Sequence, residues 1–595
     1  MDEFRVRTFD LQKVQNQTHH KTDGLSSSTL VLRRGQAFTV TINYDGRPFD
    51  PLKENLIFQI VLGPLCVEVP VSMSRQPSLT QWTAVLERRT PSPTGPRAFS
   101  VSLSSPASAS IGVYTLQMRV EARSNVKTHL LDQFTLLCNP WCQADSVFLQ
   151  SEDLRTEYVK SDIGLLFKGS PRNLVSRPWS FDQYEKGILD ICMKLLQLSP
   201  QYQANMRKDL QNRSNPVYIG RVISAMVNSN DDKGVLSGNW SGDYSDGVNP
   251  SKWSGSADIL RKWAETQFRP VKYGQCWVFA AVMCTVMRAL GIPTRVITNF
   301  NSAHGTNGNM VIEEYYNEMG EKLSIGSDSI WNFHVWVESW MKRPDLGRGY
   351  DGWQVLDPTP QERSTDEYSS RVSFSAVLQG IAVFLQLLKP PVVGENISFN
   401  VIITNKVAVP KLLRKHVNVQ NKEYNRDPTG TFWEAHNNMK IGPNETVTIK
   451  HEIFFNDYWL KEAEEDYLVN LAVVVEDVES QERVLASEEF NIRSPSLNIE
   501  IQNELSVIIN KPQVATVTFT NPFNVAVSGE LTVSGSGLLE EKAQMSLTIQ
   551  PRETIKKPVS FTPKMAGAKM LSASLVLEDP PTVLHGFKTI NVQAS

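Results

Sequence analysis

Three residues that lie far apart in the chain could together carry out nucleophilic acyl chemistry, and the first of them is a cysteine. Cys276 follows Gly-Gln and opens an apolar stretch, residues 277–290, that ends at Gly-Ile-Pro. A stretch that is apolar nearly all round and has such a stop predicts a buried helix. Cys276 would then lie at the helix N-terminus, where unpaired N–H groups and the helix dipole favour a thiolate. The alternative is a packed core cysteine, a description that fits Cys284 in the same stretch.

A histidine and an aspartate follow on two expected strands. Residues 331–338 read Trp-Asn-Phe-His-Val-Trp-Val-Glu, and the expected strand at 352–358 ends near Asp357. Taken singly, a strand histidine such as His334 is more often structural. The order of a cysteine at a helix start, then histidine and aspartate on successive strands, matches a papain-like triad. Cys276 would be the nucleophile, His334 the base and later the acid, and Asp357 the group that fixes the imidazole tautomer.

Composition indicates an ordinary globular protein of several domains. A chain of 595 residues is too long for one core, and its 41% hydrophobic and 21% charged residues are unexceptional. The net charge of −3 gives no electrostatic case for nucleic acid as a partner. No stretch is long and apolar enough to predict a transmembrane segment, and the first residues lack the apolar run of a signal peptide. Six cysteines do not suggest a disulfide framework, so we expect a cytoplasmic protein.

The pattern of apolar residues changes twice along the chain. Alternation at residues 38–44 predicts β structure in the first part, helical periodicity then appears and predicts a helix at residues 182–198, and alternation returns near residue 397. Residues 403–409 and 519–527 share the pattern Thr-Asn followed by Val-Ala-Val, which suggests two related β domains. The expected domains are an all-β segment at 1–140, an α+β core at 141–379, and small β domains at 380–492 and 493–595.

The three sequence blocks around these residues resemble the catalytic blocks of animal transglutaminases. They read Tyr-Gly-Gln-Cys-Trp-Val-Phe-Ala, Trp-Asn-Phe-His-Val-Trp and Gly-Trp-Gln-Val-Leu-Asp-Pro-Thr-Pro-Gln-Glu. The resemblance runs from the N-terminus to about Arg363 and resumes in the two C-terminal β domains. It implies a multidomain α+β protein with an N-terminal immunoglobulin-like β-sandwich, a papain-like cysteine-protease-type core and two C-terminal β-barrel or fibronectin-like domains.

The resemblance also implies a reaction. Cys276 would attack the side-chain amide of a protein glutamine and form a thioester, which a lysine or a polyamine then converts to an isopeptide bond. The oxyanion needs donors, for which the N–H of Cys276 is one candidate. The family's second donor, a tryptophan indole, falls on Trp240, for which ordinary packing is the alternative. Trp331 and Trp336 would wall the site and shield the thioester from water.

Residues 228–234 place oxygen-bearing side chains at alternate positions, as loops that bind hard cations do. On its own this segment is more simply a polar turn, and it is not an EF-hand. The resemblance implies calcium bound through the carbonyl of Ala225 and through Asn228, Asn230 and Asp232.

A second family calcium site would fall in residues 305–311, which lack the expected acidic ligand. Only Asn307, Asn309 and the later Asp328 remain as oxygen donors, so we expect weakened binding there. Some family members also bind guanine nucleotide. Asn173 stands where an aromatic residue is expected for that purpose, so nucleotide binding is not carried over to this chain.

The largest departure from the family follows Ser364, where a long core segment is missing. Loss of central strands would leave backbone groups unpaired, at a cost above a typical stability of about 5–15 kcal/mol. A catalytically silent scaffold of transglutaminase shape is therefore the first rival hypothesis to the enzyme. A cysteine protease of the same superfamily is a further rival, which the aromatic blocks disfavour.

Overall fold

The structure is a computed structural model in which two compact units are interleaved along the sequence. The described residues are 4–73, 78–87, 97–122, 125–171, 173–230, 234–304, 312, 314–323, 329–360, 380–425, 428–458, 467–578 and 581–594. One unit comprises Met1–Gly164, Ser180–Ile297 and Trp336–Pro360, and the other comprises Leu165–Trp179, Thr298–Val335 and Gln361–Ser595. Among the described residues, no helix is both long enough and apolar enough to cross a membrane.

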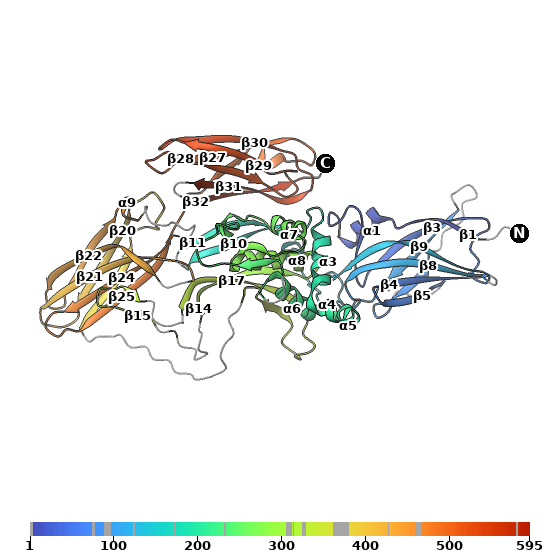
Figure 1. The fold of residues 1–595 in the computed structure, drawn as a ribbon, viewed down its shortest axis with the longest axis horizontal. Coiled ribbons are helices and arrows are strands. Elements are labelled where there is room, and N and C mark those ends of the chain that lie inside the picture. The colour runs from blue at the N-terminus through green and yellow to red at the C-terminus, as the bar shows by residue number, and fades with distance from the viewer. Residues whose placement is uncertain are drawn as a thin grey trace. The chain divides into compact units, whose positions relative to one another are not determined.

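The N-terminal part is a nine-stranded sheet, drawn in blue in Figure 1. Its strands run in the order β1-β3-β7-β6-β5-β4-β8-β9-β2, and alternate residues of β3 and β4 fill one apolar core. The expected β structure is thus observed in this part of the chain, which also contains one short helix. Its elements are β1 (Arg5–Asp10), α1 (Lys13–His20), β2 (Leu30–Arg33), β3 (Ala37–Asp45), β4 (Glu54–Leu62), β5 (Leu65–Ser72), β6 (Thr83–Leu86), β7 (Ala98–Ser104), β8 (Gly112–Ala122) and β9 (Asn125–Leu137).

The middle of the chain contains most of the helices. Among them is α8 (Cys276–Ala289), every residue of which is buried, as the apolar stretch predicts. The other helices are α2 (Glu152–Arg155), α3 (Ile188–Leu198), α4 (Pro200–Ala204), α5 (Met206–Asn212), α6 (Pro216–Val227) and α7 (Ser256–Glu265). The strands are β10 (Ile163–Ser170), β11 (Asn173–Ser180), β12 (Leu236–Gly238), β13 (Val271–Gly274), β14 (Thr294–His304), β15 (Tyr315–Tyr316), β16 (Lys322–Leu323), β17 (Ser329–Met341) and β18 (Gly352–Leu356).

Helix α8 ends where the glycine stop predicts. The N–H groups of Gly291 and Ile292 donate to the carbonyls of Arg288 and Met287 at 3.0 Å each, which closes the last turn. Gly291 has φ +84°, and a Cβ atom there would lie 2.4 Å from the carbonyl oxygen of Cys138. Only glycine therefore fits this turn, which leads directly into β14.

The sheet that continues from α8 has the order β14-β17-β18. β17 and β18 pair antiparallel, with Val337 opposite Leu356 and Met341 opposite Gly352. Thr294 on β14 and Ser339 on β17 share a buried hydroxyl hydrogen bond of 2.8 Å. Both strands expected for the histidine and the aspartate are thus confirmed as strands of one sheet.

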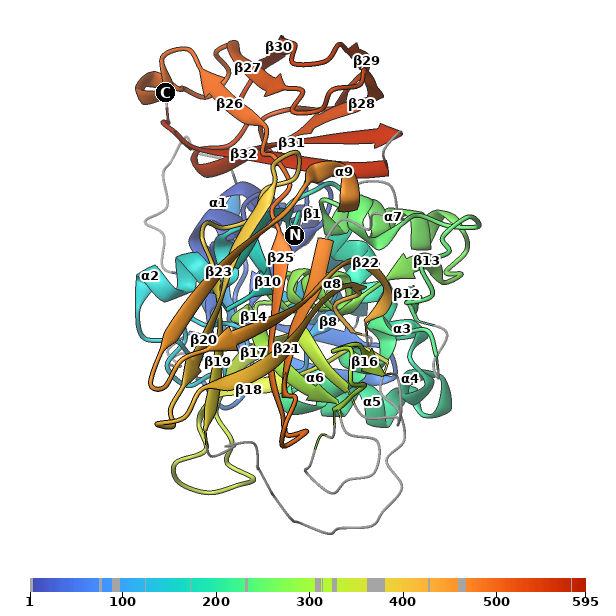
Figure 2. The same ribbon diagram turned by 90° about the vertical axis from the view of Figure 1, so that its left-hand side faces the viewer.

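The C-terminal residues form two β domains of the same design (Figure 2). Each has a three-stranded and a four-stranded sheet: β19-β20-β23 with β22-β21-β24-β25, then β26-β27-β30 with β29-β28-β31-β32. The first set comprises β19 (Ile381–Leu387), β20 (Ile397–Asn405), β21 (Lys411–Lys422), β22 (Thr429–Ile441), β23 (Thr446–Ile453), α9 (Phe455–Tyr458), β24 (Tyr467–Asp477) and β25 (Arg483–Ile492). The second comprises β26 (Asn498–Ile501), β27 (Gln513–Thr520), β28 (Val527–Ser534), β29 (Ala543–Ile549), β30 (Thr554–Phe561), β31 (Gly567–Glu578) and β32 (Pro581–Val592).

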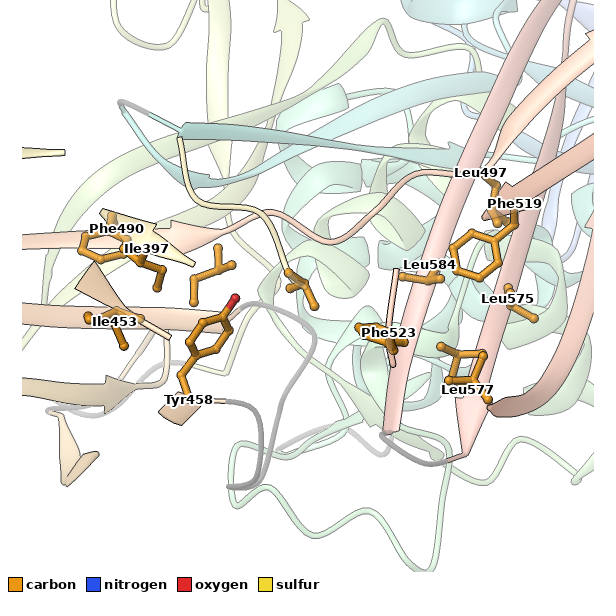
Figure 3. Close-up of a cluster of buried hydrophobic side chains, with 14 of the residues drawn as sticks. Ile397, Ile453, Tyr458, Phe490, Leu497, Phe519, Phe523, Leu575, Leu577 and Leu584 are labelled. Atoms are coloured by element: carbon orange, nitrogen blue, oxygen red, sulfur yellow. The ribbon is translucent and has the colours of Figure 1, made fainter. Parts of the chain in front are cut away.

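The sequence pattern shared by residues 403–409 and 519–527 corresponds to a turn that occurs in both domains and is held by a buried asparagine. The Asn405 side chain donates to the carbonyl of Val409 at 2.7 Å, and Asn521 donates to that of Val525 at 2.9 Å. The buried apolar side chains of both domains form one cluster (Figure 3). Phe455 and Phe523 stack within it, with ring centroids 6.1 Å apart.

One charged group lies on the apolar inner face of β21. Lys415 is 1% exposed and stands between Leu413 and Val417, which are both fully buried. Its ammonium nitrogen lies 2.6 Å from Nε2 of His451, whose ring stacks on Phe399. Burial lowers the pKa of Lys415 to about 8 and that of His451 to about 4. A cationic lysine here therefore destabilises the fold at neutral pH.

Replacing Lys415 with methionine is expected to stabilise the protein. A methionine of similar length removes the buried charge, and such replacements gain about 1–4 kcal/mol. The lysine titrates near pH 8 when folded and near 10.5 when unfolded, so its penalty is complete below pH 8 and fades as the pH rises to 10.5. Thermal melts at pH 7 and pH 10 should show a gain in Tm that is largest at pH 7. An equal gain at both pH values would show that packing, and not charge, is responsible.

Candidate active site

Cys276 is the first residue of α8, and the residue before it caps the helix without using its side chain. The N–H groups of Val278 and Phe279 donate to the carbonyl of Gln275 at 2.8 and 3.1 Å. The Gln275 side chain accepts no hydrogen bond from the first turn of the helix. The cysteine therefore lies at the positive end of a buried fourteen-residue helix, as the sequence predicts.

The Gln275 side chain instead ties the helix start to the loop that carries Trp240. Its amide nitrogen donates to the carbonyl of Asn239 at 3.0 Å and to the hydroxyl of Tyr244 at 2.9 Å. The N–H of Asn239 in turn donates to the carbonyl of Gly274 at 3.2 Å. These bonds place the Trp240 loop beside the residues that immediately precede Cys276.

The Trp240 ring packs on the same helix. It stacks on Phe279, one turn after Cys276, with centroids 6.4 Å apart and planes within 10°. A Cβ atom on Gly238 would lie 2.5 Å from this ring, so the glycine permits its close approach. Two of the residues selected from the sequence, Cys276 and Trp240, are thus brought together by one helix and its tethered loop.

Asp357 directly follows β18, as expected. Its carboxylate accepts from the N–H of Thr359 at 3.0 Å, and its carbonyl accepts from the hydroxyl of Ser224 on α6 at 3.1 Å. The first bond closes a turn that begins at the strand end. The second fixes the backbone of that turn to α6.

His334 belongs to the other compact unit and is described within it. On β17 it is half-buried, whereas Phe333 and Val335 on either side of it are fully buried, so its side chain lies on the opposite face of the strand. Its ring meets that of Trp331 edge to face, with centroids 5.5 Å apart. The N–H of Asn332 donates to the carbonyl of Tyr424 at 2.8 Å, and the Tyr424 ring stacks on Phe333.

The remaining cysteines provide a contrast with Cys276. All six cysteines are free thiols. Burial raises the pKa of Cys284 to about 11 and the pKa values of Cys138 and Cys192 to about 12. The Cys284 sulfur lies 3.7 Å from the carbonyl oxygen of Thr294. Cys284 is therefore an unreactive core thiol, as its position in the sequence indicates.

The first expected calcium segment begins at the C-terminus of α6, where carbonyl groups lack helical partners. The N–H of Ser229, four residues after Ala225, donates instead to the carbonyl of Leu236 at 2.9 Å. The side-chain oxygen of Asn228 accepts from the N–H of Asn230 at 2.9 Å. Carbonyl oxygens at the negative end of a helix dipole and amide oxygens are the kinds of donor that suit a hard cation. These residues fit the proposed ligands, and Asp232 lies outside the described residues.

Asn307, Asn309 and Asp328 of the second expected calcium site also lie outside the described residues. Asn173, where the resemblance led us to expect an aromatic residue for nucleotide binding, lies within the described residues. Its amide nitrogen donates to the carbonyl of Asn491 at 2.6 Å, and its oxygen accepts from Arg493.

Two supporting contacts are not predictable from the local sequence pattern. Gln275 is the neighbour of the proposed nucleophile in the sequence, and it also fixes the Trp240 loop. Asp246 accepts from the Tyr273 hydroxyl at 2.7 Å and the Lys272 amine at 2.5 Å, which holds the same loop from its other end. The one signal in the sequence is a polar residue directly before a helix of apolar residues.

Comparisons with known proteins agree on one family. The sequence model described as "Transglutaminase family" matches residues 7–121, and that described as "Transglutaminase-like superfamily" matches residues 243–358. Human protein-glutamine gamma-glutamyltransferase 5 is 33% identical, over 96% of this chain and 96% of its own. The crystal structure of red sea bream transglutaminase superposes with a TM-score of 0.87 at 28% identity, covering 99% of this chain and all of that one.

The same comparisons bear on the expected missing segment. The alignment with the human relative spans 702 positions, whereas this chain has 595 residues, so more than 100 positions of the alignment have no residue from this chain. Mouse protein-glutamine gamma-glutamyltransferase 2 is 46% identical, but over 64% of this chain and 55% of its own. The predicted site of the gap, after Ser364, lies outside the described residues.

Proposed function

Because this chain belongs to the transglutaminase family, we propose that it is a calcium-dependent protein-glutamine γ-glutamyltransferase that crosslinks proteins through isopeptide bonds. The observation that carries the proposal is the position of Cys276. It lies at the N-terminus of a buried helix, and the loop bearing Trp240 is hydrogen-bonded to the two residues before it.

The first half-reaction is acylation of the enzyme. The Cys276 thiolate attacks the carboxamide carbon of a glutamine side chain, and the carbonyl oxygen becomes an oxyanion. His334 gives its proton to the departing nitrogen, which leaves as ammonia, and a thioester remains on Cys276. Asp357 would hold the imidazole in the required tautomer. Splitting the amide exchange at a thioester replaces one difficult step with two easier ones.

The second half-reaction is transfer to an amine. A lysine amine, or a polyamine, attacks the thioester while His334 accepts its proton, and Cys276 leaves as the thiolate. The products are an isopeptide bond and free enzyme. Water in place of the amine would give glutamate, so apolar side chains such as Trp331 favour transfer by limiting access of water.

Both half-reactions pass through an oxyanion that requires fixed donors. The N–H of Cys276 is one proposed donor, and the indole N–H of Trp240 is the other. The stack on Phe279 and the tethered loop restrict the indole to one position. Preorganised donors of this kind need no rearrangement when charge develops on the substrate.

Calcium is proposed to bind through the carbonyl of Ala225 and the side chains of Asn228, Asn230 and Asp232, and to supply positive charge that holds this loop together. Chelation should therefore stop amine incorporation reversibly. Replacing Asp232 with asparagine should raise the calcium concentration needed for half-maximal activity at least tenfold, because it removes the one carboxylate. The shift of Tm with added calcium measures binding independently of activity. Magnesium is the control ion, and a Tm shift that persists unchanged in the Asp232→Asn variant would rule out this ligand set.

Incorporation of a labelled amine into casein tests the activity as a whole. The rival hypothesis is a catalytically silent scaffold. It rests on the more than 100 alignment positions that have no residue from this chain. A folded protein that neither incorporates amines nor reacts with iodoacetamide at neutral pH would favour the scaffold. Peptide cleavage without amine incorporation would instead indicate a protease.

A further inference from the structure

An ion pair in the first C-terminal β domain lies unusually deep. The Lys422 amine at the end of β21 and the Glu489 carboxylate on β25 are 2.5 Å apart, and their side chains are 1% and 24% exposed. Burial lowers the pKa of Lys422, against the influence of Glu489. An ion pair removed from water this far is costly unless other polar groups share it.

Other groups do share it. The amine of Lys322 lies 3.6 Å from Glu489 and 2.5 Å from Glu314, and its side chain is 3% exposed. The backbone N–H of Lys322 donates to the side chain of Gln420 at 2.9 Å, which fixes β16 on the sheet that contains β21. Two buried lysines and two carboxylates therefore form one charged network.

This network contacts the segment of β17 that carries His334. The Lys422 amine lies 3.4 Å from the carbonyl oxygen of Ile330, and the Asn332 amide nitrogen lies 3.4 Å from Glu489. Asn332 is 2% exposed, so water does not compete for this contact. Two residues beyond Lys422, the Tyr424 carbonyl accepts from the N–H of Asn332 at 2.8 Å.

The position of the contact within the strand connects it to His334. Side chains alternate along a strand, so Asn332 and His334 lie on the same face, one repeat apart. A shift or twist of the backbone between Ile330 and Asn332 would re-aim the imidazole. The network thus contacts the strand one side-chain repeat before His334.

We propose that Glu489 is a positioning residue of the reaction, which, with Lys422, fixes the strand segment that aims the His334 imidazole. The inference rests on the proposed function, because it concerns the base assigned there. Glu489 touches neither substrate nor reacting atoms and acts through Asn332 and Ile330. A residue of one C-terminal β domain thereby contributes to the chemistry of a residue from the core sequence.

The test uses Glu489→Gln in the full chain, with Glu395→Gln as the matched control. Glu395 forms an exposed ion pair with Lys389 in the same domain. For Glu489→Gln, we expect kcat for amine incorporation to fall at least tenfold with KM for the amine changed less than twofold. The pH profile of Cys276 alkylation by iodoacetamide should also change, because a displaced imidazole is a poorer acceptor for the thiol proton. Glu395→Gln should match the parent in all three measurements.

The double variant Lys422→Met/Glu489→Gln separates two effects of Glu489→Gln. One is the loss of positioning, and the other is the buried Lys422 charge left without its carboxylate. The double variant removes the buried lysine charge without restoring the carboxylate that faces Asn332, so we expect Tm to recover and kcat to remain low. Recovery of kcat, or an alkylation profile unchanged in Glu489→Gln, would overturn the proposal. If the parent protein itself incorporates no amine, the proposed function fails instead, and the alkylation profile still decides whether Glu489 acts on His334.

Discussion

Replacing Cys276 with alanine is expected to abolish amine incorporation into casein, with a loss of at least about 10³-fold in rate. The cysteine supplies the only sulfur at the N-terminus of α8, and no thioester can form without it. Alanine is the commonest small residue of helices, so the fold should remain intact. Rates of labelled amine incorporation and a thermal melt are measured on the same preparation.

Cys284→Ala is the matched control, since it removes another buried thiol from the same helix. Cys284 is a core residue with a raised pKa, so its loss should lower Tm and leave the rate per folded molecule unchanged. If Cys276→Ala retained the parental rate, the proposed nucleophile would be wrong. If both variants lost activity in proportion to Tm, only the packing of α8 would be at issue.

Replacing Trp240 with phenylalanine is expected to lower kcat by about 10²–10³-fold, the usual cost of one oxyanion donor. Phenylalanine can keep the stack on Phe279 but lacks the indole N–H. Because the donor acts on charge that develops in the transition state, KM should change little. Steady-state kinetics with a glutamine peptide and a saturating amine would separate the two constants.

Trp240→Tyr is the companion variant, because its ring carries a hydroxyl donor at a somewhat different position. We expect a rate between those of the phenylalanine variant and the parent. A phenylalanine variant within threefold of the parental kcat would show that Trp240 serves only in packing, which is the alternative for this residue.

The parts of the site that follow local rules were predictable from sequence. The all-round apolar stretch gave α8, with its start at Cys276 and its stop at Gly291. The strand expected at residues 331–338, which carries His334, is part of β17. The helix expected at residues 182–198 begins at Ile188 instead, because Asp182 and Gly187 adopt positive φ angles and form a turn. A turn of this kind leaves little trace in apolar periodicity.

The contacts that arise between distant segments were not predictable. Gln275 and Asn239 are 36 residues apart, and Lys422 and Glu489 are 67 apart, so no local pattern joins either pair. Lys415 does not follow the expected alternation of apolar and polar residues, because this lysine occupies an inward position of β21. Such polar groups are placed by tertiary pairing, which composition and periodicity do not record.

The most direct test of the central claim is detection of the acyl-enzyme. The protein is incubated with calcium and a glutamine peptide, without an amine acceptor, quenched in acid and digested for mass spectrometry. The account predicts that the fragment containing Cys276 gains the mass of the peptide less ammonia, and that adding a lysine analogue before the quench removes this adduct. An adduct on another residue, or release of ammonia from the peptide with Cys276 never modified, would contradict it.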